Sequence, residues 1–111
     1  MFSQRDIVLV PFPYSDLSAA KQRPALIISN NKMKEDKICC LITSVHAPEG
    51  IEIRKGACEQ GSLPFESWVK AYRLFTVNDR IIRKKLCRVT PKFHERVLAS
   101  LNDYVNIEAN I

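Results

Sequence analysis

Arg23 is the residue best suited to phosphate chemistry, because it stands where a polar segment meets an apolar one. Residues 14–22 are largely polar, whereas Pro24 to Ser29 (PALIIS) is almost continuously apolar. A residue before proline is biased toward extended backbone, so Arg23 is expected where a loop meets a strand. Its guanidinium is a permanent cation whose forked donors match phosphate oxygens. A plain surface charge at a strand end is the alternative interpretation.

Two hydroxyl side chains end the next apolar segment, and one imidazole follows it. Thr43 and Ser44 end this segment, where they either bind a phosphate or simply begin the next loop. His46 stands three residues after Thr43, and imidazole titrates near neutral pH, so His46 is a hypothetical proton-transfer group. His94, in contrast, falls on the first turn of a predicted helix and is expected to be exposed to solvent.

Several other chemistries find no support in the sequence. It contains no glycine-rich phosphate loop, no H-E-x-x-H and no G-x-S-x-G motif. Cys39, Cys40, Cys58 and Cys87 form no C-x-x-C pair, so we interpret them as small buried or half-buried apolar residues. We therefore expect neither a metal site nor a cofactor, and without a secretion signal we expect no disulfide framework.

The charge balance favours an anionic partner. Seventeen Lys and Arg against twelve Asp and Glu give a net charge of +5, which suits nucleic acid or an acidic protein. No apolar run approaches the roughly 20 residues of a membrane span. Arg5 and Asp6 interrupt the N-terminus too early for a signal peptide, so we expect a cytoplasmic protein without a membrane partner.

The segments predict one domain over residues 1–111, mainly β (α+β), in which a small barrel is covered by a helix. Thr90 is a good N-cap and Pro91 suits the first helical position, which predicts a C-terminal amphipathic helix. Its expected apolar face comprises Phe93, Val97, Leu98, Leu101, Tyr104 and Val105. Strands are predicted at residues 6–13, 24–29, 38–45, 51–53 and 67–77, and residues 81–89 predict a short helical turn and a closing strand. Loops are predicted at 14–22, 30–36 and 55–66.

Six segments in this order and spacing resemble the MazF/PemK toxins of type II toxin–antitoxin systems, over about residues 5–105. They are RDIVLVPFPYSD, KQRPALIIS, CLITS, GSLPFESWVKA, LFTVNDRII and LCRVTPKFHERVLASL. The resemblance implies a small SH3-like β-barrel with a C-terminal helix, a homodimer, and metal-independent, sequence-specific cleavage of single-stranded RNA. The implied products are a 2′,3′-cyclic phosphate and a 5′-hydroxyl, and the implied partner is an antitoxin with an acidic, disordered tail.

The resemblance also implies the catalytic residues. The family's active-site Arg in its R-P-A motif matches Arg23, and its Thr at the end of the third strand matches Thr43. Some members carry an Arg-x-Asp pair where this chain has Lys70 and Tyr72, so a mechanism based on that Asp is not expected here. The family's usual Gly before the first strand's Asp is replaced by Arg5, which we interpret as a structural difference.

The remaining candidates are expected to contact RNA. Tyr14 can stack on a base, and the others can reach phosphates or base edges. These others are Ser15, Lys21, Gln22, Ser44, His46, Lys70 and Arg73. The basic cluster of Arg80, Arg83, Lys84, Lys85 and Arg88 is interpreted instead as a solvated face or as a landing site for the antitoxin.

Two rival functions stay open. A relative of this fold poisons DNA gyrase by protein binding and cleaves nothing, although the R-P-A and I-T-S segments argue against that activity here. The other rival is a barrel that binds RNA without cleaving it.

Overall fold

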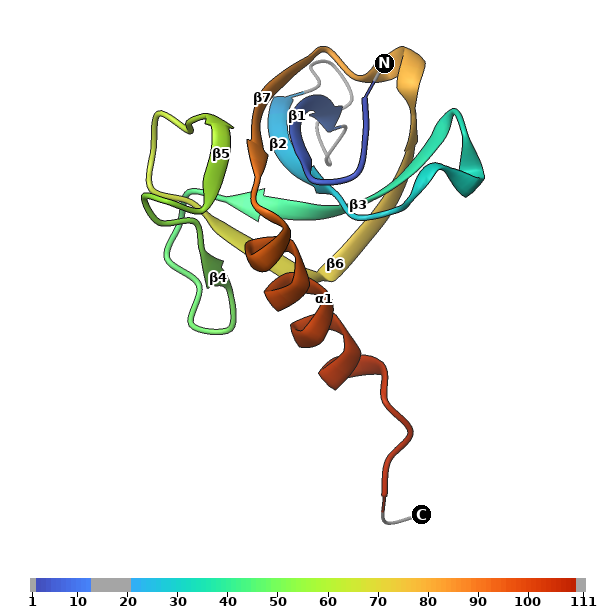
Figure 1. The fold of residues 1–111 in the computed structure, drawn as a ribbon, viewed down its shortest axis with the longest axis vertical. Coiled ribbons are helices and arrows are strands. Elements are labelled where there is room, and N and C mark those ends of the chain that lie inside the picture. The colour runs from blue at the N-terminus through green and yellow to red at the C-terminus, as the bar shows by residue number, and fades with distance from the viewer. Residues whose placement is uncertain (1, 13–20, 110–111) are drawn as a thin grey trace.

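The computed structural model describes residues 2–12 and 21–109, in which one antiparallel sheet curls into a half-barrel with a helix against it (Figure 1). The strand order is β4-β6-β3-β2-β1-β7-β5. The strands are β1 (Asp6–Phe12), β2 (Lys21–Ile27), β3 (Asp36–Thr43), β4 (Ile51–Glu52), β5 (Cys58–Gly61), β6 (Trp68–Asn78) and β7 (Lys84–Val89). Two 3-10 turns, η1 (Asn31–Met33) and η2 (Asp79–Ile81), and the helix α1 (Pro91–Val105) complete the described elements. The predicted mainly β fold with one C-terminal helix is confirmed.

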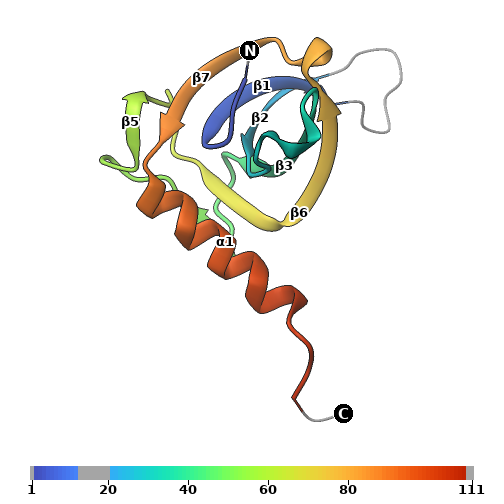
Figure 2. The same cartoon turned by 45° about the vertical axis from the view of Figure 1, so that its right-hand side comes forward.

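Helix α1 lies along one side of the half-barrel and extends beyond it toward the C-terminus (Figures 1 and 2). Its predicted N-cap is confirmed, because the Phe93 amide donates to Thr90 Oγ1 over 3.1 Å. Phe93 and Val97 are buried, whereas Leu98 and Tyr104 are partly or largely exposed. Helix packing therefore rests on the first two turns. Among the described residues, no helix has the length and apolar character needed to cross a bilayer.

Two apolar clusters lie in the sheet. The first joins the sheet to α1 and contains Ile7, Leu26, Ile28, Cys40, Ile42, Val69, Ala71, Cys87, Val89, Phe93 and Val97. The second contains Val8, Val10, Ala25, Ile27, Cys39, Val77 and Ile82. Successive residues of β1 and β2 alternate between the clusters, because side chains alternate between the faces of a strand. Both faces of these strands are thus buried, as the continuous apolar run in β2 predicted.

Three details of the sequence-based prediction were wrong. Strand β5 occupies part of the segment that we expected to be a loop, and it pairs with β7. Strand β2 begins at Lys21, before the expected start at Pro24. His94 is 4% exposed, because it lies in the first turn of a helix whose start packs closely on the sheet. It is therefore a buried residue and not a solvated one.

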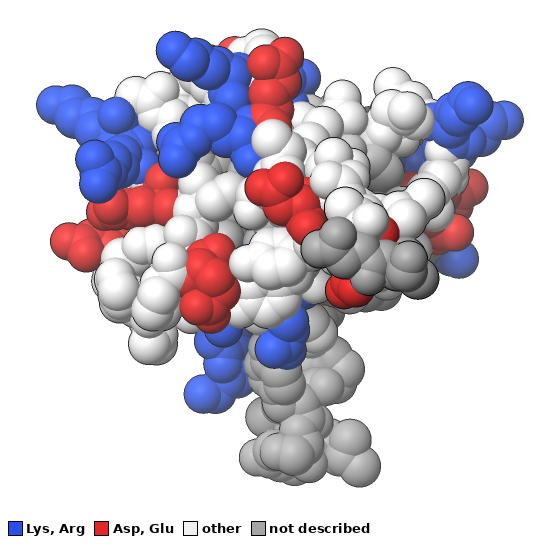
Figure 3. All heavy atoms as spheres, turned by 90° about the horizontal axis from the view of Figure 1, so that it is seen from below, with Lys and Arg blue, Asp and Glu red and all other residues white. Residues whose placement is uncertain are grey.

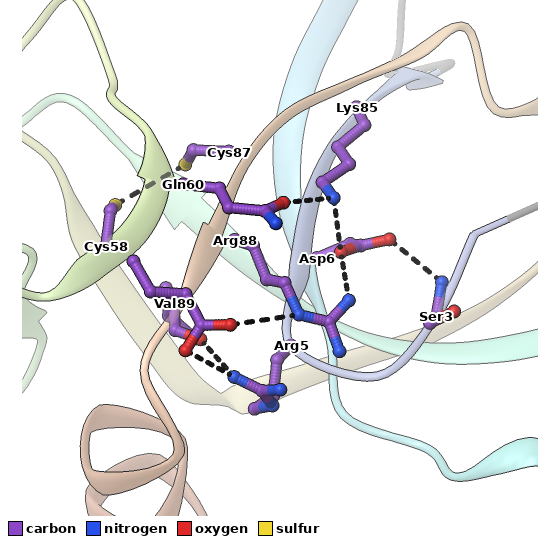
Figure 4. A network of polar contacts seen from close by, with 10 residues as sticks. Ser3, Arg5, Asp6, Cys58, Gln60, Lys85, Cys87, Arg88 and Val89 are labelled. Carbon is purple, nitrogen blue, oxygen red and sulfur yellow. Dashed lines mark hydrogen bonds and ion pairs between the residues drawn. The ribbon is translucent and has the colours of Figure 1, made fainter.

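Figure 4 shows a polar network that ties β1 to β5 and β7. The buried Asp6 forms ion pairs with Arg88 (3.0 Å) and Lys85 (3.4 Å), and it accepts a hydrogen bond from the Ser3 amide (2.9 Å). Glu59 of β5 contacts Arg88 and, at 3.1 Å, Arg5. Two members of the basic cluster, Lys85 and Arg88, are therefore engaged within the protein.

Arg5 has a positive backbone φ of 79°, in the region that glycine adopts most easily. Its amide donates to the Ile27 carbonyl and its guanidinium to the Val89 carbonyl, each over 2.9 Å. These contacts, with the Glu59 ion pair, hold the residue in place. The positive φ itself gives a physical reason for the glycine that the family resemblance implies at this position.

Candidate functional site

The sheet holds Arg23 in extended backbone near the start of β2. Arg23 pairs with Val10 of β1, and the following Pro24 favours the same extended geometry. The side chain is half-buried. Arg23 therefore lies inside β2, two residues beyond its start, and not at the junction of loop and strand that the sequence predicted.

Thr43 is the last residue of β3, in register with Trp68 of β6. Ala25 of β2 pairs with Leu41 of β3, so continuing this antiparallel register by two residues sets Arg23 opposite Thr43. The Val45 amide donates to Thr43 Oγ1 over 3.1 Å, which turns the chain at the strand end. The two predicted catalytic residues thus stand at facing ends of neighbouring strands, half-buried.

Arg23 also lines a cavity of about 460 Å³. Lys21, Gln22 and Pro24 from β2 and Ser44 after β3 line it as well. The remaining lining residues are Leu9, Leu63, Pro64, Phe65, Ser67, Lys84 and Leu86. The cavity therefore gathers Arg23 and three of the residues predicted to contact RNA (Lys21, Gln22 and Ser44), while Thr43 is not among its lining residues.

This cavity is positively charged. Among the described residues that line it, Lys21, Arg23 and Lys84 carry positive charge and none is Asp, Glu or His. Such a set stabilises a phosphate or its developing negative charge. By contrast, the face of the molecule in Figure 3 carries acidic and basic side chains next to each other. The cavity is thus more uniformly cationic than that face.

The other predicted RNA contacts lie elsewhere. His46 is exposed and lines a second cavity, of about 590 Å³, next to the N-terminal turn of α1. Its ring meets Trp68 edge-on, with the centroids 5.4 Å apart. Lys70 and Arg73 lie in β6, half-buried and exposed respectively, and neither lines the Arg23 cavity. Tyr14 and Ser15 lie outside the described residues.

Phe65 is the aromatic lining residue that the sequence analysis missed. It sits in the segment between β5 and β6, which was predicted only as a loop, and it is 73% exposed. Pro64 and a nearby glycine mark this segment as a loop, but exposure of an aromatic ring depends on the tertiary structure. A large aromatic residue within a short Gly- and Pro-containing segment is the signal that could have found it.

The cysteines take no evident part in the chemistry. Burial raises the pKa values of the Cys39, Cys40 and Cys87 thiols to about 12, so each is a poor nucleophile near neutral pH. The prediction that the cysteines are small buried or half-buried apolar residues is confirmed, since Cys39, Cys40 and Cys87 are buried and Cys58 is half-buried. Within the described ranges, no group of three or more His, Cys, Asp or Glu residues could hold a metal ion.

A comparison with protein-family models identifies the family of this chain. The family model described as "PemK-like, MazF-like toxin of type II toxin-antitoxin system" matches residues 3–105. The comparison with curated proteins finds no match. A mycobacterial endoribonuclease in complex with its cognate antitoxin superposes with a TM-score of 0.72 at 18% identity, covering 96% of this chain and 95% of that chain.

Two further structures have the same fold. A MazE-MazF structure from Deinococcus radiodurans gives a TM-score of 0.70 at 18% identity, covering 96% of this chain and 97% of that chain. The Mycobacterium tuberculosis toxin MazF-mt6 gives a TM-score of 0.72 at 12% identity, covering 94% of this chain and 99% of that chain. At these identities the likeness establishes the fold, and the match to the family model establishes the relationship.

Proposed function

The chain belongs to the PemK-like, MazF-like toxin family of type II toxin–antitoxin systems, and we propose that it is a metal-independent endoribonuclease acting on specific sequences in single-stranded RNA. The observation that carries the proposal is the cationic cavity that Arg23 lines. The β2–β3 register, continued by two residues, sets Arg23 opposite Thr43. MazF/PemK toxins are generally endoribonucleases. A mycobacterial structure of the same fold is described as one.

In the proposed reaction, the 2′-oxygen of one nucleotide attacks the neighbouring phosphorus. The 2′-hydroxyl loses its proton as a P–O2′ bond forms, the P–O5′ bond breaks, and the 5′-oxygen leaves with a proton. The products are a 2′,3′-cyclic phosphate and a 5′-hydroxyl. Because RNA supplies its own nucleophile, the protein needs only to align the phosphate, stabilise charge and transfer protons.

Arg23 is assigned to stabilise the pentacoordinate phosphorane and to donate a proton or hydrogen bond to it. A guanidinium remains protonated at ordinary pH, so it suits this task better than that of a general base. Thr43 is assigned to orient a phosphate oxygen through one hydrogen bond. The loss of one preorganised donor of this kind typically lowers kcat by about 100- to 1000-fold.

The proposed partners follow from the family. We propose that the chain forms a homodimer, acts in the cytoplasm and is neutralised by a cognate antitoxin, as in the MazE-MazF structures of the same fold. An acidic, disordered antitoxin tail would suit a chain of net charge +5 and would cover the RNA site as it folds.

The proposal is tested by incubating the purified protein with long, mixed-sequence RNA in EDTA, then mapping the cut sites and the chemistry of the ends. We expect cuts at a recurring short sequence with 5′-hydroxyl ends. Arg23→Ala and Thr43→Ala should each cut at least about 100-fold more slowly. The exposed Arg54 and Thr76 provide matched controls, and Arg54→Ala and Thr76→Ala should cut at the wild-type rate.

Three results would contradict the proposal. Cleavage abolished by EDTA would demand a metal, and 5′-phosphate ends would demand a different nucleophile. Intact RNA together with stabilised gyrase–DNA complexes would favour a gyrase poison. RNA binding without cleavage, unchanged in Arg23→Ala, would favour a binding protein.

A further inference from the structure

We propose that Phe65 is a stacking platform for one nucleobase of bound RNA, next to the cations of the Arg23 cavity. The inference rests on the proposed function for its RNA substrate, and it assigns a role to a residue in the segment between β5 and β6. That role is to hold one base in place and thereby to contribute to affinity.

Phe65 is unusually exposed for its type. Phenylalanine is normally buried, yet 73% of Phe65 is accessible. The residue lies between two cavities, since it lines both the Arg23 cavity and a neighbouring one of about 470 Å³. One side of the exposed aromatic residue is therefore close to the cationic site.

The chain around Phe65 is anchored on both sides. Leu63 packs against the apolar cluster beneath α1, and Pro64 restricts the backbone directly before Phe65. After it, Ser67 is 4% exposed and its Oγ donates to the Phe65 carbonyl over 3.0 Å. The Ser67 carbonyl accepts a hydrogen bond from the Ile53 amide over 2.8 Å. An aromatic residue held in this way loses little conformational freedom on binding.

The chemistry around Phe65 fits a nucleotide. A ring face accepts any base by stacking, and nearby cations hold the phosphate that follows it. Lys21, Arg23 and Lys84 supply those cations in the same cavity, whose described lining residues include no carboxylate. Glu66, the next residue, lines the neighbouring cavity instead. The cavity volume of about 460 Å³ lies within the usual range for small-ligand sites.

Two other occupants fit less well. A second copy of this chain that paired through the same face would bring like cations against this cavity, which is unfavourable. An acidic peptide would satisfy the cations, but it would engage Phe65 only where it carries an apolar side chain in register. Single-stranded RNA offers both a flat base and a phosphate at every nucleotide.

The test measures binding of a mixed-sequence, single-stranded RNA with 2′-O-methyl groups throughout, which cannot be cleaved by its own 2′-oxygen. Phe65→Leu keeps an apolar side chain without a ring, and Phe65→Trp keeps a ring. Stacking on an aromatic side chain contributes roughly 1–3 kcal/mol per base, so Phe65→Leu should weaken binding about 5- to 150-fold. Phe65→Trp should bind at least as well as wild type, and its added tryptophan emission should change with the same Kd.

Cleavage of natural RNA gives a second readout. Phe65→Leu should raise KM more than it lowers kcat, because the ring holds a base and not the reacting phosphate. Tyr104→Leu is the matched control, since Tyr104 is an aromatic residue, 52% exposed, on α1; it should not change RNA affinity. Thermal denaturation checks that each variant is folded.

Wild-type RNA affinity in Phe65→Leu overturns the inference. So does a Phe65→Leu variant that loses antitoxin binding or changes its oligomeric state while it binds RNA normally. If the wild type binds RNA in a Phe65-dependent way yet never cleaves it, the proposed function fails and the platform stands. If the wild type cleaves RNA and Phe65→Leu is unaffected, the platform fails and the proposed function stands.

Discussion

His94 is a buried histidine in the first turn of α1, outside the proposed site. Burial lowers the pKa of His94 below its ordinary value of 6.5, the charge of Arg5 lowers it further, and the Ile28 carbonyl partly offsets both. The folded protein therefore favours the neutral imidazole. The unfolded chain, where the pKa is ordinary, takes up a proton at a higher pH.

His94 should accordingly make the protein less stable in mild acid. Well above pH 6.5 the imidazole is neutral in both the folded and the unfolded state. As the pH falls through 6.5, the unfolded state binds the proton first, so the free energy of unfolding decreases. Urea denaturation should show that the free energy of unfolding falls more between pH 7.5 and pH 5.0 in the wild type than in His94→Gln. His46→Gln, at an exposed histidine, should keep the wild-type loss. Equal losses in the wild type and His94→Gln would show that His94 does not contribute.

At the scale of elements, α1 depends on its first two turns. Its buried residues, Phe93, His94 and Val97, all lie within the first seven residues of the helix, next to the Thr90 cap. The remainder of the helix extends past the sheet with its side chains largely exposed (Figure 2). The start of α1 thus determines how firmly the helix is held.

Thr90→Ala should lower the free energy of unfolding by about 1 kcal/mol, because the Phe93 amide loses its acceptor. Thr90→Ser should lower the free energy of unfolding much less, since serine keeps the hydroxyl. Thr76→Ala removes an exposed threonine from β6 and serves as the control in urea denaturation. Should Thr90→Ala and Thr76→Ala have equal effects, the cap would not be a significant source of stability.

The sequence predicted elements well where local signals were strong. Thr90 and Pro91 predicted the start of α1, and apolar runs predicted β1, β2, β3 and β6. Strand β5 was missed because Cys58–Gly61 (CEQG) has no apolar alternation; it is a strand through its pairing with β7. Arg23 and Thr43 were proposed from the residue pattern and the family motifs, whereas their relative positions depend on the β2–β3 register. Phe65 was missed because no local pattern fixes the exposure of a ring.

At the scale of the whole molecule, Asp6 joins the two ends of the chain's β-structure. Strand β1 pairs with β2 and β7, and the side chain of Asp6 is 3% exposed where it meets Arg88 and Lys85. A buried carboxylate is tolerated because two cations and the Ser3 amide satisfy it. Removing it would leave Lys85 without this ion pair and Arg88 with Glu59 alone.

Asp6→Ala should lower the free energy of unfolding by about 3 kcal/mol, the lower end for breaking a buried pair, because Arg88 and Lys85 retain partial access to water. Asp36→Ala removes an exposed aspartate that accepts one hydrogen bond from Asn78, and it should lose well under 1 kcal/mol. Urea denaturation at neutral pH compares the two. A loss at Asp6 as small as that at Asp36 would contradict this role for the network.

The left-handed backbone at Arg5 has a consequence for how this sequence can diverge. Glycine at position 5 adopts that backbone without help, whereas arginine relies on Glu59 and the Val89 carbonyl. A lineage that retains Arg5 is therefore constrained at position 59, and a lineage that returns to glycine is released from that constraint. Positions 5 and 59, separated by most of the half-barrel's sequence, should covary as one inherited unit.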